Sequence, residues 1–301
     1  MSCPPAASAL PDGFATVGRV MSVTFSIPID TIPDALDLEP DVPGLDWIED
    51  DPDLEAGPIH LYVHGSSTAV LTIAVTDEMT LEVRVPLTAS PTDWGLAFDV
   101  IELAMEQAET VLVELDGGEP FTIDELREHC DATWQQSQAA SATRALRLLT
   151  EGGPVQAPGP IRSAHLGSRV MAELAADEAD DDEQGRRLLA VLRRVQWVTG
   201  PHDRAVALHI PDADGRSHSV AVIGPDLRYV LPPTDHLLVE NGDLADDAAE
   251  LVIPSEALTA LPGITVQWLD DGNRLMEAVP ESQWPLVIEA AAAHRIAGPK
   301  Q

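Results

Sequence analysis

The sequence has little positive charge. Its 301 residues include 17 Lys and Arg against 51 Asp and Glu, which gives a formal net charge of −34 at pH 7, and its one lysine is Lys300. Proteins that hold nucleic acid carry a basic patch that neutralises phosphates, and cations also attract proteins to anionic membrane surfaces. We therefore expect neither nucleic acid nor a membrane surface as a partner.

Cysteine and long apolar runs are also scarce. Cys3 and Cys130 are the two cysteines, and no run of 18 apolar residues occurs. Because Cys3 lies near the N-terminus, a structural disulfide is not expected, and the pair fits a reducing compartment. Residues 1–20 lack the basic start and continuous apolar segment of a signal peptide. We predict a cytoplasmic protein in which residues 1–20 are a disordered extension, or one whose true start is Met21.

Sequence motifs for catalysis and cofactor binding are missing. The chain contains no G-x-S-x-G, phosphate-binding loop, G-x-G-x-x-G, C-x-x-C or H-E-x-x-H. His60 and His64 are four residues apart, but in an extended strand that spacing separates two side chains by about 13 Å. We therefore expect no cofactor and no metal from these motifs.

Residues 71–108 form the segment around which the rest of the chain is organised. They predict a strand at 71–75, a turn at Asp77 and Glu78, a strand that alternates through Leu81, Val83 and Val85, and a helix. The sequence Ser-Pro-Thr-Asp at 90–93 is typical of a helix start. The apolar residues of the helix recur at steps of three and four, at Trp94, Ala97, Ile101, Ala104 and Ala108. An amphipathic helix after antiparallel strands indicates an α+β arrangement.

The Pro/Gly-rich segment at 151–160 predicts a linker between two domains. We expect an acidic α+β domain at 21–150 and a second α+β domain at 161–301, each a mainly antiparallel sheet with helices packed on one face. In the first, strands are expected at 21–29, 59–64 and 110–115. Thr122 and Glu125 form a capping box for a helix that we expect to continue to Thr150, and Cys130 is expected to be a buried structural residue of that helix.

The second part of the chain predicts helices at 168–176 and 281–294 and a helix that begins after the acidic run at 177–183. Two alternating segments flank residues 212–215, and the Asp-Gly there favours a hairpin turn. Further strands are predicted at 227–231, 236–240, 250–254 and 264–269. Four residues in this part form the enzyme alternative, in which a site is assembled from scattered side chains: His209, His218, Asp235 and His236.

Residues 30–58 are rich in proline and in acidic residues. No Lys or Arg occurs between Arg19 and Arg84, while Trp47 lies among carboxylates. An aromatic residue surrounded by acids is what a hot spot for a basic partner needs. A solvated loop is the plainer interpretation of the same residues. The candidate partner-binding residues are Asp46, Trp47, Glu49, Asp50, Asp51 and Asp53.

The leading functional hypothesis from the sequence is a non-enzymatic acidic protein that binds a basic protein partner. An immunity-like, antitoxin-like or regulatory role is one version of it, by analogy with the class alone. The alternatives are the enzyme with its site in the second domain, a nucleic-acid mimic, and a structural protein that its charge keeps soluble.

Overall fold

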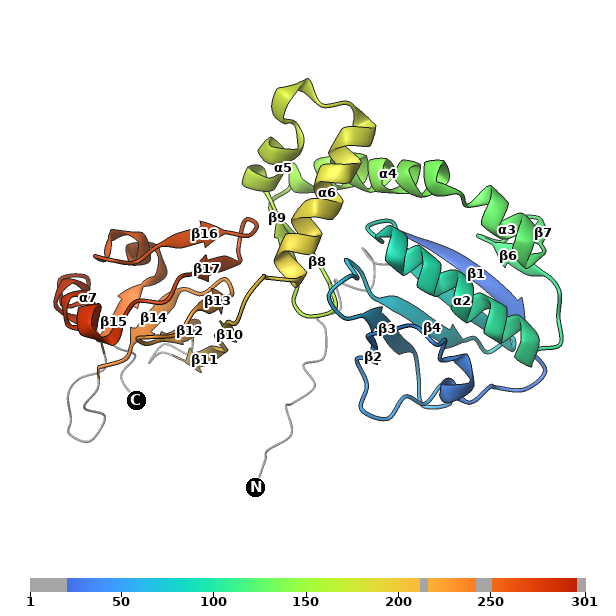
Figure 1. Ribbon diagram of the computed structural model, residues 1–301, viewed down its shortest axis with the longest axis horizontal. Helices are drawn as coiled ribbons and strands as arrows, with labels where there is room; N and C mark the ends of the chain where they lie inside the picture. The colour runs from blue at the N-terminus through green and yellow to red at the C-terminus, as the bar shows by residue number, and fades with distance from the viewer. Residues whose placement is uncertain (1–20, 212–215, 242–250, 297–301) are drawn as a thin grey trace. The chain divides into compact units, whose positions relative to one another are not determined.

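The structure is a computed structural model that describes residues 21–211, 216–241 and 251–296 (Figure 1). Its contacts divide the described chain into two compact units. The first comprises residues 21–153, 157–163 and 171–196, and the second comprises residues 154–156, 164–170 and those from 197 onward. Helices combine with mainly antiparallel sheets, so the predicted α+β class is confirmed.

A seven-stranded antiparallel sheet is the centre of the first unit. Its strand order is β2-β3-β4-β5-β1-β6-β7. The strands are β1 (Ser22–Pro28), β2 (Leu45–Trp47), β3 (Ile59–Val63), β4 (Leu71–Val75), β5 (Thr80–Pro86), β6 (Val113–Leu115) and β7 (Pro120–Phe121). The strand predicted at 110–115 is shorter than expected, because Val111 and Leu112 are exposed and precede β6.

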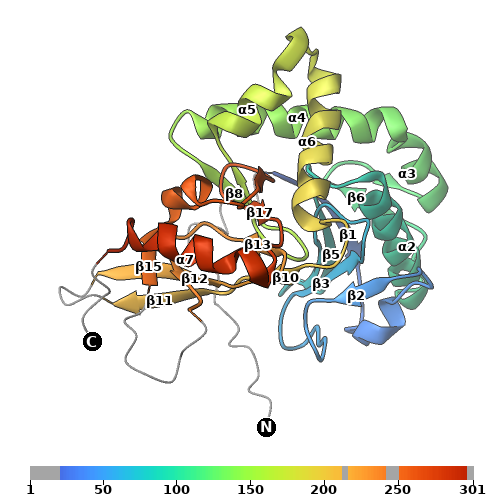
Figure 2. The ribbon, with the colours of Figure 1, turned by 60° about the vertical axis from the view of Figure 1, so that its left-hand side comes forward.

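Strand alternation gives this sheet one apolar and one polar face. Phe25, Ile73 and Val83 are fully buried on the apolar face, and helix α2 (Pro91–Gln107) lies across it (Figures 1 and 2). The opposite face carries residues such as Thr24 and Arg84, which pair across β1 and β5. The predicted packing of a helix stripe on one sheet face is therefore confirmed.

The predicted start of α2 is confirmed in detail. Ser90 caps the helix, Pro91 begins it, and Ser90 and Asp93 form a reciprocal capping box. The same Asp93 Oδ2 accepts hydrogen bonds from the backbone N–H and hydroxyl of Thr68, each at 3.1 Å. Burial raises the pKa of Asp93, although the hydroxyl and backbone donors around it act in the opposite direction. The carboxylate thus ties the loop after β3 to the helix.

The single helix predicted from Thr122 to Thr150 is wrong. Thr122 and Glu125 do form a capping box, but the chain forms two helices, α3 (Ile123–His129) and α4 (Ala132–Thr150). Cys130 leaves helical geometry, and Asp131 caps α4 by accepting from the backbone N–H of Trp134 at 2.8 Å. Cys130 is buried as predicted, and burial raises its pKa to about 12.

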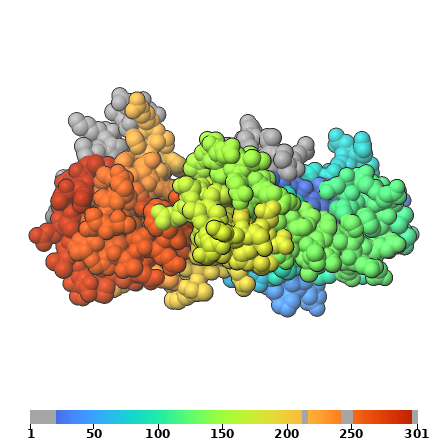
Figure 3. Space-filling view, turned by 90° about the horizontal axis from the view of Figure 1, so that it is seen from above, coloured from blue at the N-terminus to red at the C-terminus, as the bar shows by residue number. Residues whose placement is uncertain are grey.

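A second helix pair completes the first unit. After α5 (Ser168–Leu174) and a short 3-10 turn, η2 (Ala176–Glu178), helix α6 (Asp181–Gln196) packs along α4, and the space-filling view shows the two helices in direct contact (Figure 3). An ideal Cβ built on Gly185 of α6 would lie 2.8 Å from the backbone nitrogen of Ala140, so glycine permits the close approach. The domain boundary predicted at 151–160 stays a prediction. Helix α4 precedes that segment and helix α6 follows it, and both helices belong to the first unit.

The second unit contains two four-stranded sheets, with orders β10-β13-β17-β16 and β11-β12-β14-β15. The strands are β10 (Asp203–Arg204), β11 (Ala207–Pro211), β12 (Ser217–Ile223), β13 (Tyr229–Leu231), β14 (His236–Val239), β15 (Leu251–Pro254), β16 (Val266–Trp268) and β17 (Arg274–Met276). Strands β11 and β12 pair antiparallel, as the hairpin prediction requires. The turn itself, at 212–215, lies outside the described residues.

The core of the second unit lies between the inner faces of these sheets, where Leu231, Leu237 and Met276 are fully buried. The 3-10 segments η3 (Ser255–Ala260) and η4 (Glu281–Gln283) and the helix α7 (Trp284–Ala292) cover it. The indole N–H of Trp284 donates to the Glu240 carbonyl at 2.8 Å. Together, η4 and α7 match the helix predicted at 281–294.

The turn between β16 and β17 fastens an earlier segment to the second unit. Asp271 accepts hydrogen bonds from the backbone N–H groups of Gly167, Arg169 and Val170, at 2.7, 2.9 and 3.0 Å. These groups lie at the start of α5, just after the strand pair β8 (Val155–Ala157) and β9 (Ala164–Leu166). Asp270 holds the same segment by accepting from the His165 N–H at 2.8 Å.

Candidate functional site

Residues 30–58, here called the acidic segment, are built into the first unit. They contain the 3-10 helix η1 (Ala35–Leu38) and the edge strand β2. Asp34 caps η1 by accepting from the Leu36 N–H at 3.0 Å. Leu38 and Leu54 are buried in the core, at 0% and 5% exposure. Apolar anchors at both ends therefore hold the carboxylates of this segment at the sheet edge.

Asp46 and Trp47 point to opposite faces of the sheet. They are neighbours on β2, and successive strand residues alternate between faces. Asp46 pairs with Tyr62 on the polar face, whereas Trp47 pairs with Leu61 and packs on the core. The Trp47 indole N–H also donates to Glu39 at 3.3 Å. The exposed acid and the aromatic ring therefore do not form one continuous contact surface.

The Asp46 carboxylate is engaged within the protein. Its Oδ2 accepts from the Tyr62 hydroxyl at 2.8 Å, and its Oδ1 accepts from the backbone N–H of Trp47 at 3.0 Å. Burial, the hydrogen bond to Asp46 and the negative charge of Asp46 together raise the pKa of Tyr62 to about 12. The neutral phenol therefore stabilises the fold below its ordinary pKa of about 10, and this contribution is lost as the pH rises through about 12.

A phenol titration tests this geometry. Since Tyr62 and Tyr229 are the two tyrosines, the Tyr229→Phe protein isolates Tyr62, whose phenolate absorbance should appear near pH 12. Adding Asp46→Ala removes both the acceptor and the charge, so the midpoint should fall toward 10. An unchanged midpoint after Asp46→Ala would show that the two side chains are not paired.

Glu49 is directed at His60 on the neighbouring strand. Its two carboxylate oxygens meet the His60 backbone N–H at 2.9 Å and the His60 ring Nδ1 at 2.6 Å. Both side chains are about one-third exposed. Glu49 therefore helps to join the end of β2 to β3.

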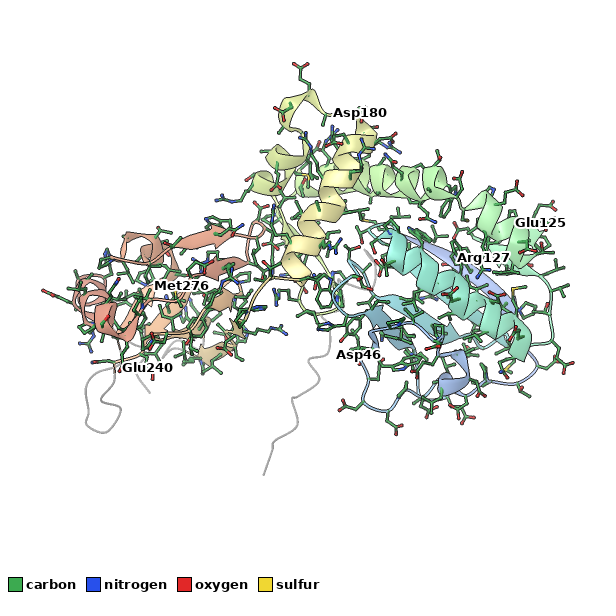
Figure 4. All side chains as sticks on the ribbon, viewed as in Figure 1. Asp46, Glu125, Arg127, Asp180, Glu240 and Met276 are labelled. Carbon is green, nitrogen blue, oxygen red and sulfur yellow. The ribbon has the colours of Figure 1, made fainter. Side chains whose placement is uncertain are left out.

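Asp50 and Asp51 lie on the bend that follows β2, Asp53 lies two residues further along the chain, and all three are exposed. Asp53 accepts from the backbone N–H of Glu55 at 2.9 Å, a local turn contact that leaves its carboxylate at the surface. With Asp46 at the adjacent strand edge (Figure 4), these residues form an exposed anionic surface. Of the six predicted residues, these four carboxylates face solvent, while Trp47 and Glu49 are partly buried.

Sequence reasoning missed Glu39, His60 and Tyr62, which contact the predicted residues. The usable signal was the alternation of the strand at 59–63, where Ile59, Leu61 and Val63 are buried. That pattern sends His60 and Tyr62 to the polar face. Their pairing with Glu49 and Asp46 depends on the register of β2, which the short strand did not reveal.

The four residues of the enzyme alternative are divided between two faces of one sheet. The register places Val220 opposite His236 and Ile210 opposite His218, so both histidines lie on the face away from the core, with ring centroids 5.2 Å apart. His209 and Asp235 lie on the other face. Asp235 accepts from the backbone N–H and hydroxyl of Ser219, at 2.8 and 2.9 Å, and these bonds lower its pKa. His209 and His218 therefore lie on opposite faces of the sheet.

A pocket of about 360 Å³ lies elsewhere, where the C-terminal part of α2 meets the start of α3. Met105, Val111 and Ile123 provide apolar walls, while Glu102 and Glu106 line it from α2. Arg127 of α3 donates to Glu102 at 2.7 Å (Figure 4). None of the four enzyme candidates lines this pocket.

Metal and membrane sites were sought in the same part of the chain. Within residues 21–211, 216–241 and 251–296, no three His, Cys, Asp or Glu side chains are grouped as a metal site requires. Across the same ranges, no helix has both the length and the apolar character needed to cross a bilayer.

The comparisons with known proteins return no relative. No protein family, curated protein or solved structure matches this chain.

Proposed function

We propose that this is a non-enzymatic, cytoplasmic binding protein whose acidic segment takes a basic protein partner. The observation that carries the proposal is the exposed anionic surface at Asp46, Asp50, Asp51 and Asp53, in a stretch of sequence without Lys or Arg from residue 20 to residue 83. Because the buried residues Leu38 and Leu54 anchor the segment, these carboxylates hold their positions before a partner binds. Little ordering entropy then opposes association.

Electrostatics favour a basic partner over other classes. The net charge of −34 generates a field that speeds the approach of cations and repels polyanions. Several arginines elsewhere in the first unit pair with acids, as in the Arg127–Glu102 pair between α3 and α2 and the Arg194–Glu173 pair between α6 and α5. Exposed rim charges mainly set the association rate and its salt dependence. The proposed complex should therefore form rapidly and weaken as salt is added.

Salt-titrated capture of basic proteins with matched charge variants tests the proposal. Deleting residues 30–58 would remove buried Leu38 and Leu54, so substitution is the cleaner probe. The four-fold variant Asp46→Asn, Asp50→Asn, Asp51→Asn and Asp53→Asn should weaken partner binding at least tenfold, mainly through slower association.

The control removes four negative charges from exposed positions elsewhere in the first unit, with Glu114→Gln, Glu119→Gln, Asp124→Asn and Glu128→Gln. Both variants have the same net charge, so a difference between them locates the surface. Equal losses from both would show attraction to total charge alone. Failure of wild-type protein to capture any basic protein at low salt would remove the basis of the proposal.

A further inference from the structure

The sheet β11-β12-β14-β15 has a second apolar face that the core does not use. Its inner face contributes Ala221, Leu237 and Ile253 to the core of the second unit. The register places Leu208, Val220, His236 and Pro254 in one row on the opposite face, with Val222, Leu238 and Val252 in the next row. Together with Ile210 and His218, these residues are here called the outer face.

The outer face contains no charged residue. All nine of its members are aliphatic side chains, proline or histidine. An antiparallel sheet that faces water normally alternates apolar and polar residues, as the polar face of the seven-stranded sheet does. In a chain in which 23% of residues are charged, a charge-free strand face is unexpected unless something covers it.

Exposure on this face is uneven, and Val220 on β12 is only 3% exposed although it pairs with Leu208. Val252 on β15 is 3% exposed, Val222 on β12 is 39% exposed, and Leu208 on β11 is 50% exposed. Val206, just before β11, is 67% exposed. Strand β11 ends the sheet in the order of the described strands. The uncovered apolar area is therefore concentrated where the sheet also offers an unpaired edge.

We infer that the outer face and its β11 edge form the contact between two copies of this chain. The argument for a second copy is electrostatic: two chains of net charge −34 repel each other wherever carboxylates meet, and the outer face offers a surface without them. A two-fold contact places the same surface on both partners. Apolar surface matches apolar surface there, whereas a basic partner would find no carboxylate to pair with.

Salt separates this contact from the proposed function. Added salt screens repulsion between the two copies and strengthens apolar association. The homodimer should therefore tighten as salt rises, whereas binding of a basic partner to the acidic segment should weaken. The inference does not rest on the proposed function, and either can fail alone.

The test is sedimentation velocity of the full chain over a range of concentrations at low and high salt. Wild-type protein is expected to dimerise reversibly and more tightly at high salt. Leu208→Glu and Val222→Glu bury a carboxylate in the contact, and each should raise the dimer dissociation constant by about 100-fold or more.

The matched control is Leu286→Glu on α7, which adds the same charge at an apolar position that is 57% exposed and lies away from the outer face. It should leave dimerisation unchanged. Circular dichroism checks folding, and the uncharged pair Leu208→Gln and Val222→Thr replaces any glutamate variant that does not fold. A wild-type monomer at every concentration and salt would overturn the inference, as would a dimer that the outer-face variants leave intact.

Discussion

Replacing Asp271 with alanine is expected to lower the free energy of unfolding of the second unit by about 3–5 kcal/mol. The carboxylate accepts three backbone N–H groups at the start of α5. Hydrogen bonds to a charged acceptor are worth about 1.5–3 kcal/mol each, and water regains part of that loss. A carboxylate at a helix start also interacts favourably with the helix dipole. The remote Asp271 therefore acts as the cap that the sequence of α5 itself does not supply.

Two further substitutions grade this effect. Asp271→Asn retains an acceptor but removes the charge, so about 1–2 kcal/mol should be lost. Glu289→Ala removes an exposed acid from α7 and should change the free energy by less than about 0.5 kcal/mol. Urea unfolding measures the totals, and hydrogen exchange of peptides from 164–174 and 266–276 shows where protection is lost. An Asp271→Asn variant as stable as the wild type would contradict the role of the charge.

Gly185→Ala is expected to destabilise the first unit by about 2 kcal/mol, although alanine is the better helix former. A Cβ at this position would lie 2.8 Å from the Ala140 nitrogen and 3.0 Å from the Ala139 carbonyl carbon. Both obstacles are backbone, so no side-chain rotation relieves the contact and α4 must move away from α6. The larger Gly185→Val should cost about twice as much.

The control is the same substitution in another helix. Gly95 is exposed in α2, and an added Cβ there meets nothing within 4 Å. Gly95→Ala should therefore stabilise the protein by about 0.5–1 kcal/mol, because alanine restricts the unfolded chain and favours the helix. Chemical denaturation of the two variants should give changes of opposite sign. If both variants gain stability, the helices do not meet at Gly185.

Local signals predicted the segment from β4 to α2 well. The alternation of β5 and the Ser90 capping sequence are each contained in a few adjacent residues, and both are confirmed. The same kind of signal was overlooked at Asp131, whose capping role divides α3 from α4. Gly185 inside a helical pattern was a further local sign, because a glycine within a helix often marks close packing.

Long-range pairing could not be predicted from such signals. Strand β1 lies between β5 and β6, and β12 pairs in parallel with β14, although neither arrangement has a marker in the sequence. The negative charge of the acidic segment was evident from its composition. The opposite directions of Asp46 and Trp47 were not, because they depend on strand β2, which has only three residues and therefore no clear alternation. The outer face could not be predicted either, because its residues come from four strands whose pairing has no marker in the sequence.

The edge strand β2 of the acidic segment limits the kind of partner that can bind there. The register directs the N–H groups of Leu45 and Trp47 away from β3, yet Val42 and Asp46 already accept them, at 3.1 and 3.0 Å. An extended peptide that joined the sheet here would have to displace both bonds. Recognition at this edge is thus left to side chains, so a folded basic surface is a better match than an unfolded strand. The same two bonds protect the β2 edge of this sheet from pairing with a strand of another chain.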